Sequence, residues 1–451
     1  MQCSALSTAN IGSRIAYPNT TAYTESLHSY FGERPTMASP RLSCPFAIRS
    51  GGHATVLGAS AIADGVTIDL SLMNKTIYKP ATGIVSIQPG ARWSSVYDAL
   101  AKTGVMVPGG RIASVGVGGY LTGGGNSFYA AQVGLACDSV RAYEIVLADG
   151  KILQVSRDSN PDLFRALKGG SNNFGVVTMF HMDAFPADTL LWGGGVIYPP
   201  LVMPQFISAA TRFTDSVPRD SYASLTTFHG YNSTTDQSVL SASLVYTRSE
   251  AWPDAFDDFY NIPNATYTMK FTSLLDLATD GSLPFPYGYR NILETGTYLN
   301  REDIHERATL IHAKQIEQAK GLANSKDFNI LTIVQPWVPQ FWANPAGCGG
   351  NVLGLERFNQ SMIMVAWDYS WDDASDDDLF YGLVRSARGE LDLYAQRTGA
   401  HSEYVYLNYA GAEQDPLRGY GKENLDFLRG VAQEYDPQGV FQSLVPGGFK
   451  L

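Results

Sequence analysis

Apolar residues follow helical and strand spacings in quick succession over the first 185 positions, with glycines between them. The predicted elements are a strand within 86–93 that ends at Pro89-Gly90, a helix over 94–104, a hairpin over 141–155, a helix over 160–170 and a strand over 172–182. Turn residues mark where elements end, at Pro89-Gly90, Gly104 and Asp149-Gly150. Asn160 is expected to cap the second helix, because a short polar side chain can accept a free N–H of the first turn.

The pattern changes between about 190 and 400, where glycine becomes rarer and the apolar stripes become longer. Helices are predicted over 301–322 and 377–397, and strands over 241–249 and 361–370. Strands mixed with long helices predict an α+β unit in which helices cover one face of a sheet.

The C-terminal part of the chain returns to short motifs. Residues 403–411 predict a strand that leads into a loop, with Tyr404, Tyr406 and Asn408 on one face and Tyr409 at its end. A helix is expected over 423–437, where Pro437 stops it.

Composition and charge exclude several classes of protein. The chain has 451 residues, 45% of them apolar and 17% charged, which is typical of a folded protein with two packed units. The net charge is −11 and no cluster of Lys and Arg stands out, so nucleic acid is not an expected partner. No apolar run is long enough for a bilayer, and the first residues lack the apolar core of a secretory leader. The chain as written is therefore expected to be soluble and intracellular.

The four cysteines give no indication of a metal site. No C-x-x-C pair occurs among Cys3, Cys44, Cys137 and Cys348, so no zinc centre is expected. A Cys3–Cys44 disulfide is compatible with the sequence but is not determined by it. Five N-x-[ST] sequons matter only if the chain is exported, and chance explains them equally well. They begin at Asn19, Asn74, Asn232, Asn264 and Asn359.

The segment RSGGH, from Arg49 to His53, places a histidine directly after two glycines. The glycines let the backbone turn sharply and approach a ligand closely. A neutral imidazole is a competent nucleophile, and the C8 methyl of a flavin is electrophilic in its quinone-methide form. His53 could therefore carry a flavin covalently, although a hydrogen-bonded structural histidine is the more common role for such a residue.

Eight glycines between Gly109 and Phe128 exceed what a strand or a helix requires. Such a stretch can present consecutive backbone N–H groups to a pyrophosphate, while a packed glycine-rich turn is the alternative. The pattern is not G-x-G-x-x-G, and GxxxxGK[ST] is absent from the chain. A nicotinamide site of the usual kind and an ATP site are therefore disfavoured.

Two further regions complete the set of motifs: GLACDSV and ALKGGSNNFGVVT, at 134–140 and 166–178, and YVYLNYA at 404–410. In order and spacing, the four motifs resemble the berberine-bridge-enzyme-like branch of FAD-linked oxidases, within the vanillyl-alcohol oxidase superfamily. The resemblance runs from Cys44 to Val177 and from Tyr404 to Lys450. It implies a two-part FAD-binding domain of the PCMH type and a separate α+β substrate domain.

The resemblance also implies roles for single residues. His53 is similar to the histidine bonded to the flavin, and Tyr409 to the proposed catalytic base, with Tyr406 lining the same cavity. Val117 falls at the position thought to gate oxygen access, where valine is typical of an oxidase. The residues that fall where the family surrounds FAD are Ser50, Gly51, Gly52, Ala54, Gly116, Gly118, Gly119, Asn126, Asp138, Val177 and Asn408.

Three features depart from the family pattern. Ile112 stands where bicovalent members have a second, cysteinyl attachment, so attachment through His53 alone is expected. Tyr120 stands where many plant relatives have histidine. Between Tyr30 and Cys44 a strand–helix–strand segment of about 30 residues is missing, which shortens the FAD-binding part. The expected division is 1–185 for the FAD-binding domain, 186–400 for the substrate domain and 401–451 for a segment returning to the FAD-binding domain.

The resemblance implies an FAD-dependent oxidase of a small molecule in fungal secondary metabolism. Tyr409 would take a proton from an alcohol or phenol, a hydride would pass to the flavin, and O2 would reoxidise the flavin to give hydrogen peroxide. A carbohydrate oxidase is the alternative in substrate class. The missing segment suggests another alternative, an inactive and flavin-poor binding protein. A nicotinamide dehydrogenase is disfavoured because its fingerprint is absent.

Overall fold

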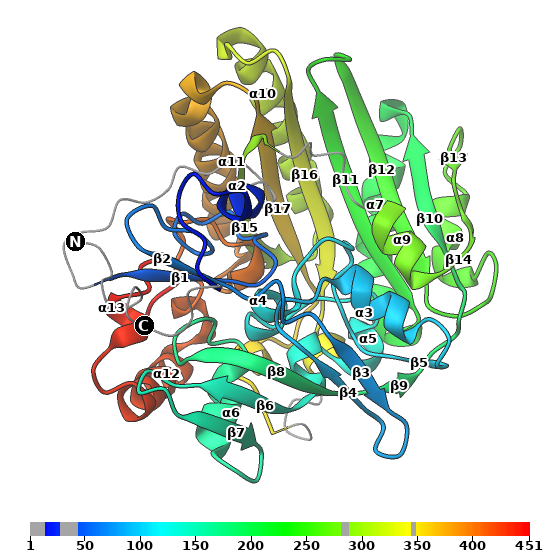
Figure 1. Ribbon diagram of the computed structural model, residues 1–451. Coiled ribbons are helices and arrows are strands. Elements are labelled where there is room, and N and C mark those ends of the chain that lie inside the picture. Colours follow the sequence, from blue (N-terminus) through cyan, green and yellow to red (C-terminus); the bar gives the residue numbers. More distant parts are fainter. Residues whose placement is uncertain (1–13, 28–43, 281–287, 344–348) are drawn as a thin grey trace.

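The structure is a computed structural model that describes residues 14–27, 44–280, 288–343 and 349–451 (Figure 1). Two large sheets dominate it, one from the N-terminal part of the chain and one from the middle. Helices pack on both sheets, which confirms the predicted mixed fold. The segment expected to be missing between Tyr30 and Cys44 falls mostly outside the described residues, so that expectation stays a prediction, as do the domain limits.

The first sheet has five strands, each antiparallel to its neighbours. In spatial order they are β3 (Thr76–Lys79), β4 (Ile84–Ile87), β8 (Val176–Asp183), β6 (Val140–Val146) and β7 (Ile152–Ser156). β6 and β7 form the predicted hairpin, and Gly150 in its turn has φ 83°. The core beneath the sheet includes Tyr143, whose ring contacts Phe180 of β8 and Phe164 of α6 (Pro161–Leu167).

Two helix ends near this sheet differ from the prediction. Pro161 begins α6 as expected, but the Asn160 side chain makes no capping hydrogen bond. Its backbone is left-handed (φ 55°), and its amide donates instead toward the Gln154 carbonyl and Ser159 Oγ. α3 (Trp93–Leu100) ends earlier than expected, so Gly104 (φ 70°) belongs to the following turn.

Four short strands form two pairs apart from the large sheets. β1 (Phe46–Arg49) is parallel to β2 (Val66–Asp69), and the buried Arg49 guanidinium pairs with Asp69. β5 (Val105–Met106) is antiparallel to β9 (Phe185–Pro186). The ion pair of Arg49 fixes the C-terminal end of β1. The turn that carries His53 begins directly after that end.

The cysteines of the described chain have different states. Cys44, just before β1, is in a disulfide, whereas Cys137 is a buried thiol. Cys3 and Cys348 lie outside the described residues, so the Cys3–Cys44 pairing stays a prediction.

The second sheet has nine strands, and neighbouring strands are antiparallel throughout. In spatial order they are β13 (Thr266–Tyr267), β10 (Leu191–Tyr198), β12 (Gln237–Tyr246), β11 (Ala223–Asn232), β16 (Phe328–Trp337), β17 (Met362–Trp371), β15 (Arg290–Leu299) and β18 (His401–Ser402), with β14 (Lys270–Thr272) also paired to β10. β12 and β17 match the strands predicted over 241–249 and 361–370.

Helices cover one face of the second sheet, as predicted. α10 (Glu302–Leu322) and α11 (Asp377–Thr398) pack on its central strands beside α7 (Met203–Ser216) (Figure 1). Trp367 of β17 belongs to the core under these helices, together with Ile304 and Leu391. Successive strand residues point to opposite faces, so Ala366 and Asp368 point to the other face of the sheet. This other face is turned toward the candidate site described below.

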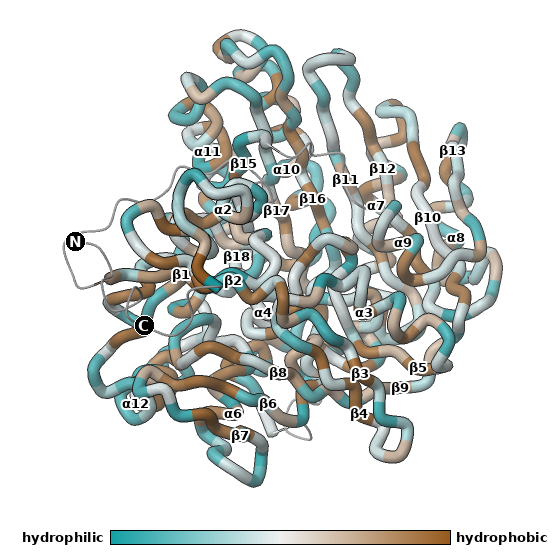
Figure 2. Tube along the Cα trace, viewed as in Figure 1, coloured by the Kyte–Doolittle hydropathy of each residue, from teal (hydrophilic) through white to brown (hydrophobic). Residues whose placement is uncertain are grey.

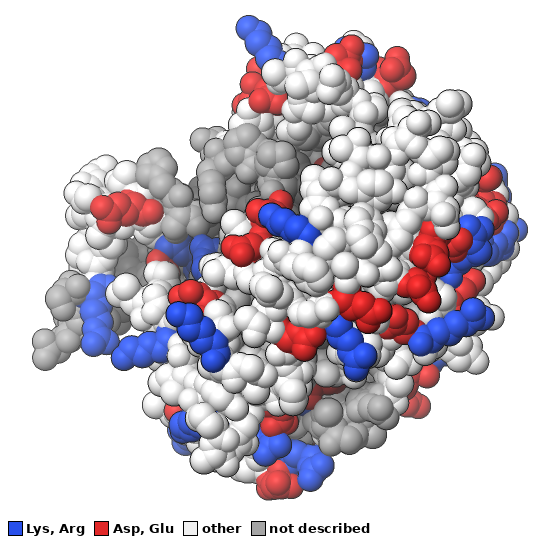
Figure 3. All heavy atoms as spheres, turned by 90° about the vertical axis from the view of Figure 1, so that its right-hand side faces the viewer, with Lys and Arg blue, Asp and Glu red and all other residues white. Residues whose placement is uncertain are grey.

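The distribution of hydrophobic and charged residues agrees with this layered arrangement. Figure 2 shows the most hydrophobic stretches along strands of both sheets and hydrophilic residues mainly in loops. On the face drawn in Figure 3, Lys and Arg are intermixed with Asp and Glu. Such intermixing includes ion pairs like Lys270–Asp280 (3.0 Å) and Arg212–Asp258 (2.8 Å). Of the helices that the structure describes, none combines the length and apolar character needed to cross a membrane.

Three buried histidines lie between the second sheet and its helices. His229 is on β11, while His305 and His312 are on α10, and the rings of His229 and His312 are 6.0 Å apart. Burial lowers the pKa of His229 to about 4 and the pKa values of His305 and His312 to about 3. All three are therefore neutral in the folded protein near pH 7.

Folding stability is expected to fall as the pH drops below about 6.5. The unfolded chain protonates these histidines near that pH, whereas the folded chain resists protonation down to the lowered pKa values. Between the unfolded pKa and the lowered folded pKa, each histidine then lowers the free energy of unfolding by about 1.4 kcal/mol for each pH unit. Urea unfolding at several pH values between 7 and 5 measures the slope. His229→Phe keeps a ring and should reduce the histidine contribution by about a third, and an unchanged slope would contradict this account.

The predicted strand over 403–411 is wrong. Residues 407–409 form a short 3-10 turn, closed by a hydrogen bond from the Tyr409 N–H to the Tyr406 carbonyl (3.0 Å). Tyr404 and Tyr406 are both buried against Trp337, with ring centroids 5.8 and 5.1 Å away. Side-chain packing on Trp337, instead of pairing with a strand, therefore holds this segment.

The C-terminal residues pack on the first sheet and its helix. α12 (Lys422–Tyr435) matches the helix predicted over 423–437 and contacts α6, where Arg165 donates to Asn424 (2.5 Å). α13 (Val440–Ser443) follows. The Asn173 amide then donates to the Phe449 carbonyl (3.0 Å). Residues more than 250 positions apart thus lie side by side.

Candidate active site

The His53 imidazole is fixed by a tight turn and by one hydroxyl. Gly52 has φ 65°, a left-handed conformation that glycine adopts at no steric cost. The ring Nε2 of His53 lies 2.9 Å from Ser114 Oγ. This contact joins the RSGGH turn to the glycine-rich stretch that follows Gly109.

The two glycine segments touch backbone to backbone. A Cβ added at Gly51 would lie 2.4 Å from Gly116 Cα, and one added at Gly116 would lie 2.3 Å from the Gly51 nitrogen. Ser50 holds the same junction, because its hydroxyl donates to the Pro89 carbonyl (2.5 Å) and accepts from the Gly118 N–H (3.1 Å). The result is a rigid surface of backbone atoms, here called the glycine surface and defined by residues 50–53 and 116–119.

The glycine surface is open beside Gly119. A Cβ added there would meet no atom within 4 Å, and Gly119 is exposed although Gly118 is buried. Close-packed backbone bordered by open space lets a phosphate-bearing cofactor approach main-chain N–H groups. These residues therefore fit a flavin dinucleotide.

Alanine at Gly116 is expected to force the two glycine segments apart. The clash should lower the free energy of unfolding by about 1–3 kcal/mol and lower the flavin content, both measurable by thermal unfolding and flavin absorbance. Gly119→Ala should not destabilise the fold, because its methyl group meets no protein atom, but that group would occupy the open space proposed for the cofactor and should weaken flavin binding. Gly389→Ala, on the exposed side of α11, should stabilise by about 0.5–1 kcal/mol. If Gly116→Ala and Gly389→Ala had the same free energy of unfolding and flavin content, the contact between the two glycine segments would not matter for folding or flavin binding.

Val117 and Tyr120 lie on α4 (Val117–Thr122), which begins directly after Gly116. Val117 is fully buried, and its N–H donates to the Ala91 carbonyl (3.0 Å). The Tyr120 hydroxyl donates to the Asn126 carbonyl (2.7 Å). The helix therefore fixes the loop that carries Asn126 toward the tyrosines described next.

Tyr406 is held by two hydrogen bonds to its oxygen. It accepts from the Asn126 N–H (2.9 Å) and from the Asn408 amide (3.1 Å), which also donates to the Tyr120 carbonyl (3.0 Å). Burial raises the pKa of Tyr406 by more than these bonds lower it. Tyr406 therefore keeps its proton at neutral pH.

Tyr409 lies beside Tyr406 and against a cation. The two ring centroids are 5.2 Å apart, and Tyr409 is only partly buried. Arg111 donates to the Tyr409 hydroxyl (3.2 Å), to Thr226 Oγ1 (3.1 Å) and to Gln335 Oε1. A fixed positive charge thus lies next to the phenol oxygen.

Arg111, Thr226 and Gln335 were not among the predicted site residues. Arg111 stands within the glycine-rich stretch, and a lone charge among glycines was the feature that could have pointed to it. Thr226 and Gln335 lie on β11 and β16, and only the pairing of these strands brings them together.

Residues 111–114 join the contacts of His53 to the contacts of Tyr409. The Ser114 hydroxyl contacts His53, while Arg111, three residues earlier, contacts Tyr409. Three residues span at most about 11 Å. The Ser114 carbonyl also accepts from Arg92 (2.5 Å), which fixes the far end of the segment. Residues 111–114 therefore link the surroundings of His53 to those of Tyr409.

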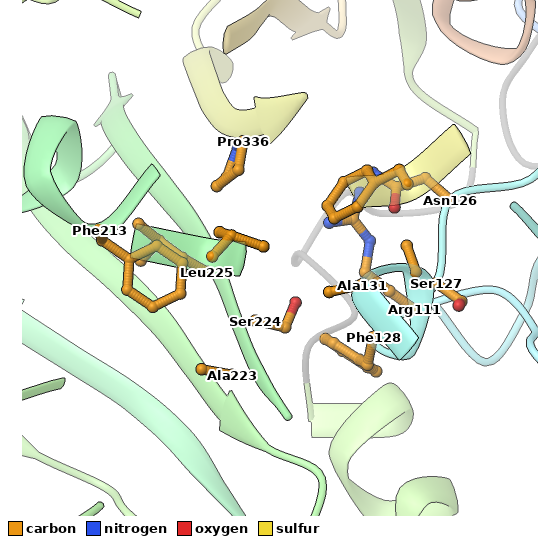
Figure 4. Close-up of a pocket in the computed structure, with 13 residues that line it drawn as sticks. Arg111, Asn126, Ser127, Phe128, Ala131, Phe213, Ala223, Ser224, Leu225 and Pro336 are labelled. Atoms are coloured by element: carbon orange, nitrogen blue, oxygen red, sulfur yellow. The ribbon is translucent and has the colours of Figure 1, made fainter. Parts of the chain in front are cut away.

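A narrow pocket lies beside Arg111 (Figure 4). Asn126, Ser127 and Ala131 lie on one of its sides, and Ser224 and Leu225 of β11 lie on the other. It has room for little more than one water molecule, so an organic substrate does not fit there. The substrate is therefore expected on the Tyr409 side of Arg111.

An apolar surface of the second sheet extends from Tyr409. The Tyr409 ring packs on Leu331 and Ile333 of β16 and Ala366 of β17, which point away from the helices. Phe228 of β11 and Leu293 of β15 pack on the same three residues. This apolar face consists of Phe228, Leu293, Leu331, Ile333 and Ala366.

The remaining residues predicted to contact the flavin differ in how deeply they are buried. Asp138 is buried, accepts from the Asn351 amide (2.9 Å) and has its carbonyl 3.5 Å from Lys168 Nζ. Burial raises the pKa of this carboxyl. Val177 is buried in β8, and Ala54 is exposed after His53. Within the described ranges, no three His, Cys, Asp or Glu side chains gather in a metal-binding arrangement.

Comparisons with known proteins indicate an FAD-binding protein. The FAD binding domain family matches residues 38–156. The FAD-dependent monooxygenase sdcF of Emericella nidulans is 56% identical over 100% of this chain and 98% of its own. The solved structure of BBE-like 1 from Physcomitrella patens has a TM-score of 0.76 at 19% identity and covers 98% of both chains. Glucooligosaccharide oxidase from Acremonium strictum, described with a 6-S-cysteinyl, 8α-N1-histidyl FAD, has a TM-score of 0.68 at 18% identity, over 90% of this chain and 86% of its own.

Proposed function

Because the chain belongs to the berberine-bridge-enzyme-like FAD-linked oxidoreductases of the vanillyl-alcohol oxidase superfamily, we propose that it oxidises an alcohol or phenol-type small molecule with O2. The relatives of this chain are named as enzymes, which favours an enzyme over the inactive, flavin-poor binding protein. The observation that carries the proposal is the Tyr409 phenol, which is held against Arg111 at the foot of the apolar face.

Tyr409 is the proposed proton acceptor. Tyr409 is partly exposed and packs at the apolar face, and the Arg111 guanidinium beside its oxygen would stabilise the phenolate form that accepts the proton. Arg111 is itself held by Thr226 and Gln335, so this charge needs no rearrangement during the reaction.

Two neighbours orient the substrate oxygen in this proposal. Tyr406 keeps its proton and therefore acts as a hydrogen-bonding neighbour, not as a base. Gln335 Nε2 is buried and has no hydrogen-bond partner among the described residues. A buried donor without a partner is costly, so an oxygen of the bound substrate is its natural acceptor.

The glycine surface would hold the cofactor in place. Bound FAD supplies the two-electron acceptor for the reaction. His53 would carry it covalently, with the backbone of residues 50–52 and 116–119 alongside. The histidyl attachment described for glucooligosaccharide oxidase supports this role, and Ile112 leaves no thiol for a second bond.

The overall reaction converts an alcohol into a carbonyl compound. The alcohol loses two hydrogens and O2 gains them as hydrogen peroxide, so atoms and electrons balance. Val117, which belongs to the glycine surface, supports O2 as the acceptor by the family resemblance. The apolar face favours a hydrophobic metabolite over an oligosaccharide, because sugar hydroxyls need polar partners when they lose water.

The named activity of the sdcF relative supports a second candidate, a monooxygenase. A monooxygenase places one atom of O2 in the product, whereas the proposed oxidase returns both atoms as peroxide. Turnover under labelled O2 separates the two outcomes by the mass of the product.

Acid precipitation of the purified protein tests the cofactor and substrate proposals together with a peroxide assay. Flavin fluorescence that stays with the precipitate is expected, and peroxide should form with phenolic or polyketide alcohols more than with oligosaccharides. Flavin found only in the supernatant would exclude the covalent bond. Peroxide formed only with oligosaccharides would establish the carbohydrate oxidase.

A further inference from the structure

Asp368 lies on the same side of the second sheet as the apolar face. In β17 it is two residues beyond Ala366, and its backbone is paired with Leu293 on one side and Leu331 on the other. Both leucines belong to the apolar face that packs against Tyr409. Paired side chains on one face of a sheet are about 5 Å apart, so the carboxyl is surrounded by apolar groups.

The Asp368 carboxyl makes no contact that stabilises the described part of the fold. No hydrogen bond or ion pair of Asp368 is found among the described residues, and the residue keeps partial exposure. Other buried acids in this part of the chain are paired: Glu294 with Arg388 (2.7 Å), and Asp376 with the Ser325 N–H (2.6 Å). Burial without such partners raises the pKa of Asp368 to about 7. An unpaired carboxyl at an apolar wall is costly for folding, which indicates a role in binding.

The distance between Asp368 and Arg111 along the sheet indicates how long the substrate is. Leu331, its cross-strand partner, and Gln335, which holds Arg111, are four residues apart on β16. Four strand residues span about 13 Å, and Ile333 lies between them. Beyond Asp368, Asn329 donates to Ser370 (3.2 Å), so the surface becomes polar again.

We propose that Asp368 is a specificity-determining residue that accepts a hydrogen bond from a hydroxyl or ammonium group at the substrate end remote from Tyr409. This inference rests on the proposed function, since the reacting end of the substrate is placed at Tyr409 and Arg111. It defines the substrate class as an elongated, mainly apolar molecule with an oxygen at the reacting end and a hydrogen-bond donor at the far end. The apolar face covers the middle of such a molecule.

Binding of three probes to the whole protein tests this inference. The probes are 4-phenylphenol, 4,4′-dihydroxybiphenyl and 4′-aminomethyl-4-hydroxybiphenyl, which share one end and differ at the other. Calorimetric titration above the pKa of Asp368 should give about tenfold tighter binding of both two-ended probes than of 4-phenylphenol, since a hydrogen bond to a charged group contributes about 1.5 kcal/mol. Asp368→Leu should remove both preferences and leave the affinity for 4-phenylphenol within about twofold.

Asp368→Asn separates the two donor groups and guards against misfolding of the leucine variant. It keeps an acceptor oxygen without charge, so preference for the diol should remain while preference for the amine is lost. Asp372→Asn, at an exposed position just after β17, is the matched control and should change no ratio. Equal wild-type affinity for all three probes, absence of binding, or full preferences in Asp368→Leu would overturn the inference. Flavin retention and peroxide formation test the proposed function separately, because these affinity ratios do not require turnover.

Discussion

Replacing Tyr409 with phenylalanine is expected to leave a folded, flavin-containing protein whose turnover is about 100- to 10,000-fold slower. The phenyl ring can keep the contacts with Tyr406 and the apolar face, so binding and stability should change little. What is lost is the oxygen that accepts the substrate proton next to Arg111. Initial rates of peroxide formation and the visible flavin spectrum of the same preparation measure the two quantities.

Tyr435→Phe is the matched control for this substitution. Tyr435 donates to Asp162 on α6 (3.0 Å), away from the candidate site, and its replacement should leave the rate unchanged. A wild-type rate in Tyr409→Phe would show that the base is another residue. A rate loss accompanied by loss of flavin would show that Tyr409 supports the cofactor and would leave its role as a base unsupported.

His53→Ala is expected to abolish covalent flavin completely. All flavin fluorescence should move from the acid precipitate to the supernatant, because Ile112 provides no second attachment. The backbone of the glycine surface remains, so FAD added in excess should still bind. Turnover should fall by up to about 100-fold, since loss of the bond releases the ring from its fixed position.

Ser114→Ala separates attachment from positioning. It removes the hydroxyl 2.9 Å from the His53 ring without touching the imidazole. Covalent flavin should still form, but more slowly when FAD is added to the cofactor-free protein. Persistent covalent flavin in His53→Ala would place the bond on another residue and reject the tether.

The sequence predicted the long elements of the fold best. The helix expected over 301–322 is α10 (Glu302–Leu322), because neither a strand nor a loop keeps an apolar stripe at helical spacing over so many turns. The same reasoning failed at 403–411, where alternating tyrosines suggested a strand. There the deciding contact is with Trp337, more than sixty residues away in sequence, and no local pattern contains that information.

The sequence likewise predicted the parts of the candidate site that are local motifs, but not the parts that depend on strand pairing. RSGGH and the glycine-rich stretch are local motifs, and both lie at the glycine surface. Arg111, Gln335 and Asp368 depend on how strands pair in the second sheet. Asp368 lay within a strand predicted correctly, but the sequence did not show which face of that strand would carry Tyr409.

The late position of the C-terminal residues has a consequence for how the protein is made. Gly447 packs so closely on Gly58 that an added Cβ would lie 1.9 Å from the Gly58 carbonyl carbon, and the Asn172 amide donates to the Gly447 carbonyl (3.1 Å). While the ribosome is still adding the middle of the chain, the N-terminal third therefore lacks the partner that completes its packing, and Tyr409 does not yet exist beside Arg111. We therefore expect stable cofactor binding only after residues 404–451 have been synthesised, and chains truncated before them should be colourless.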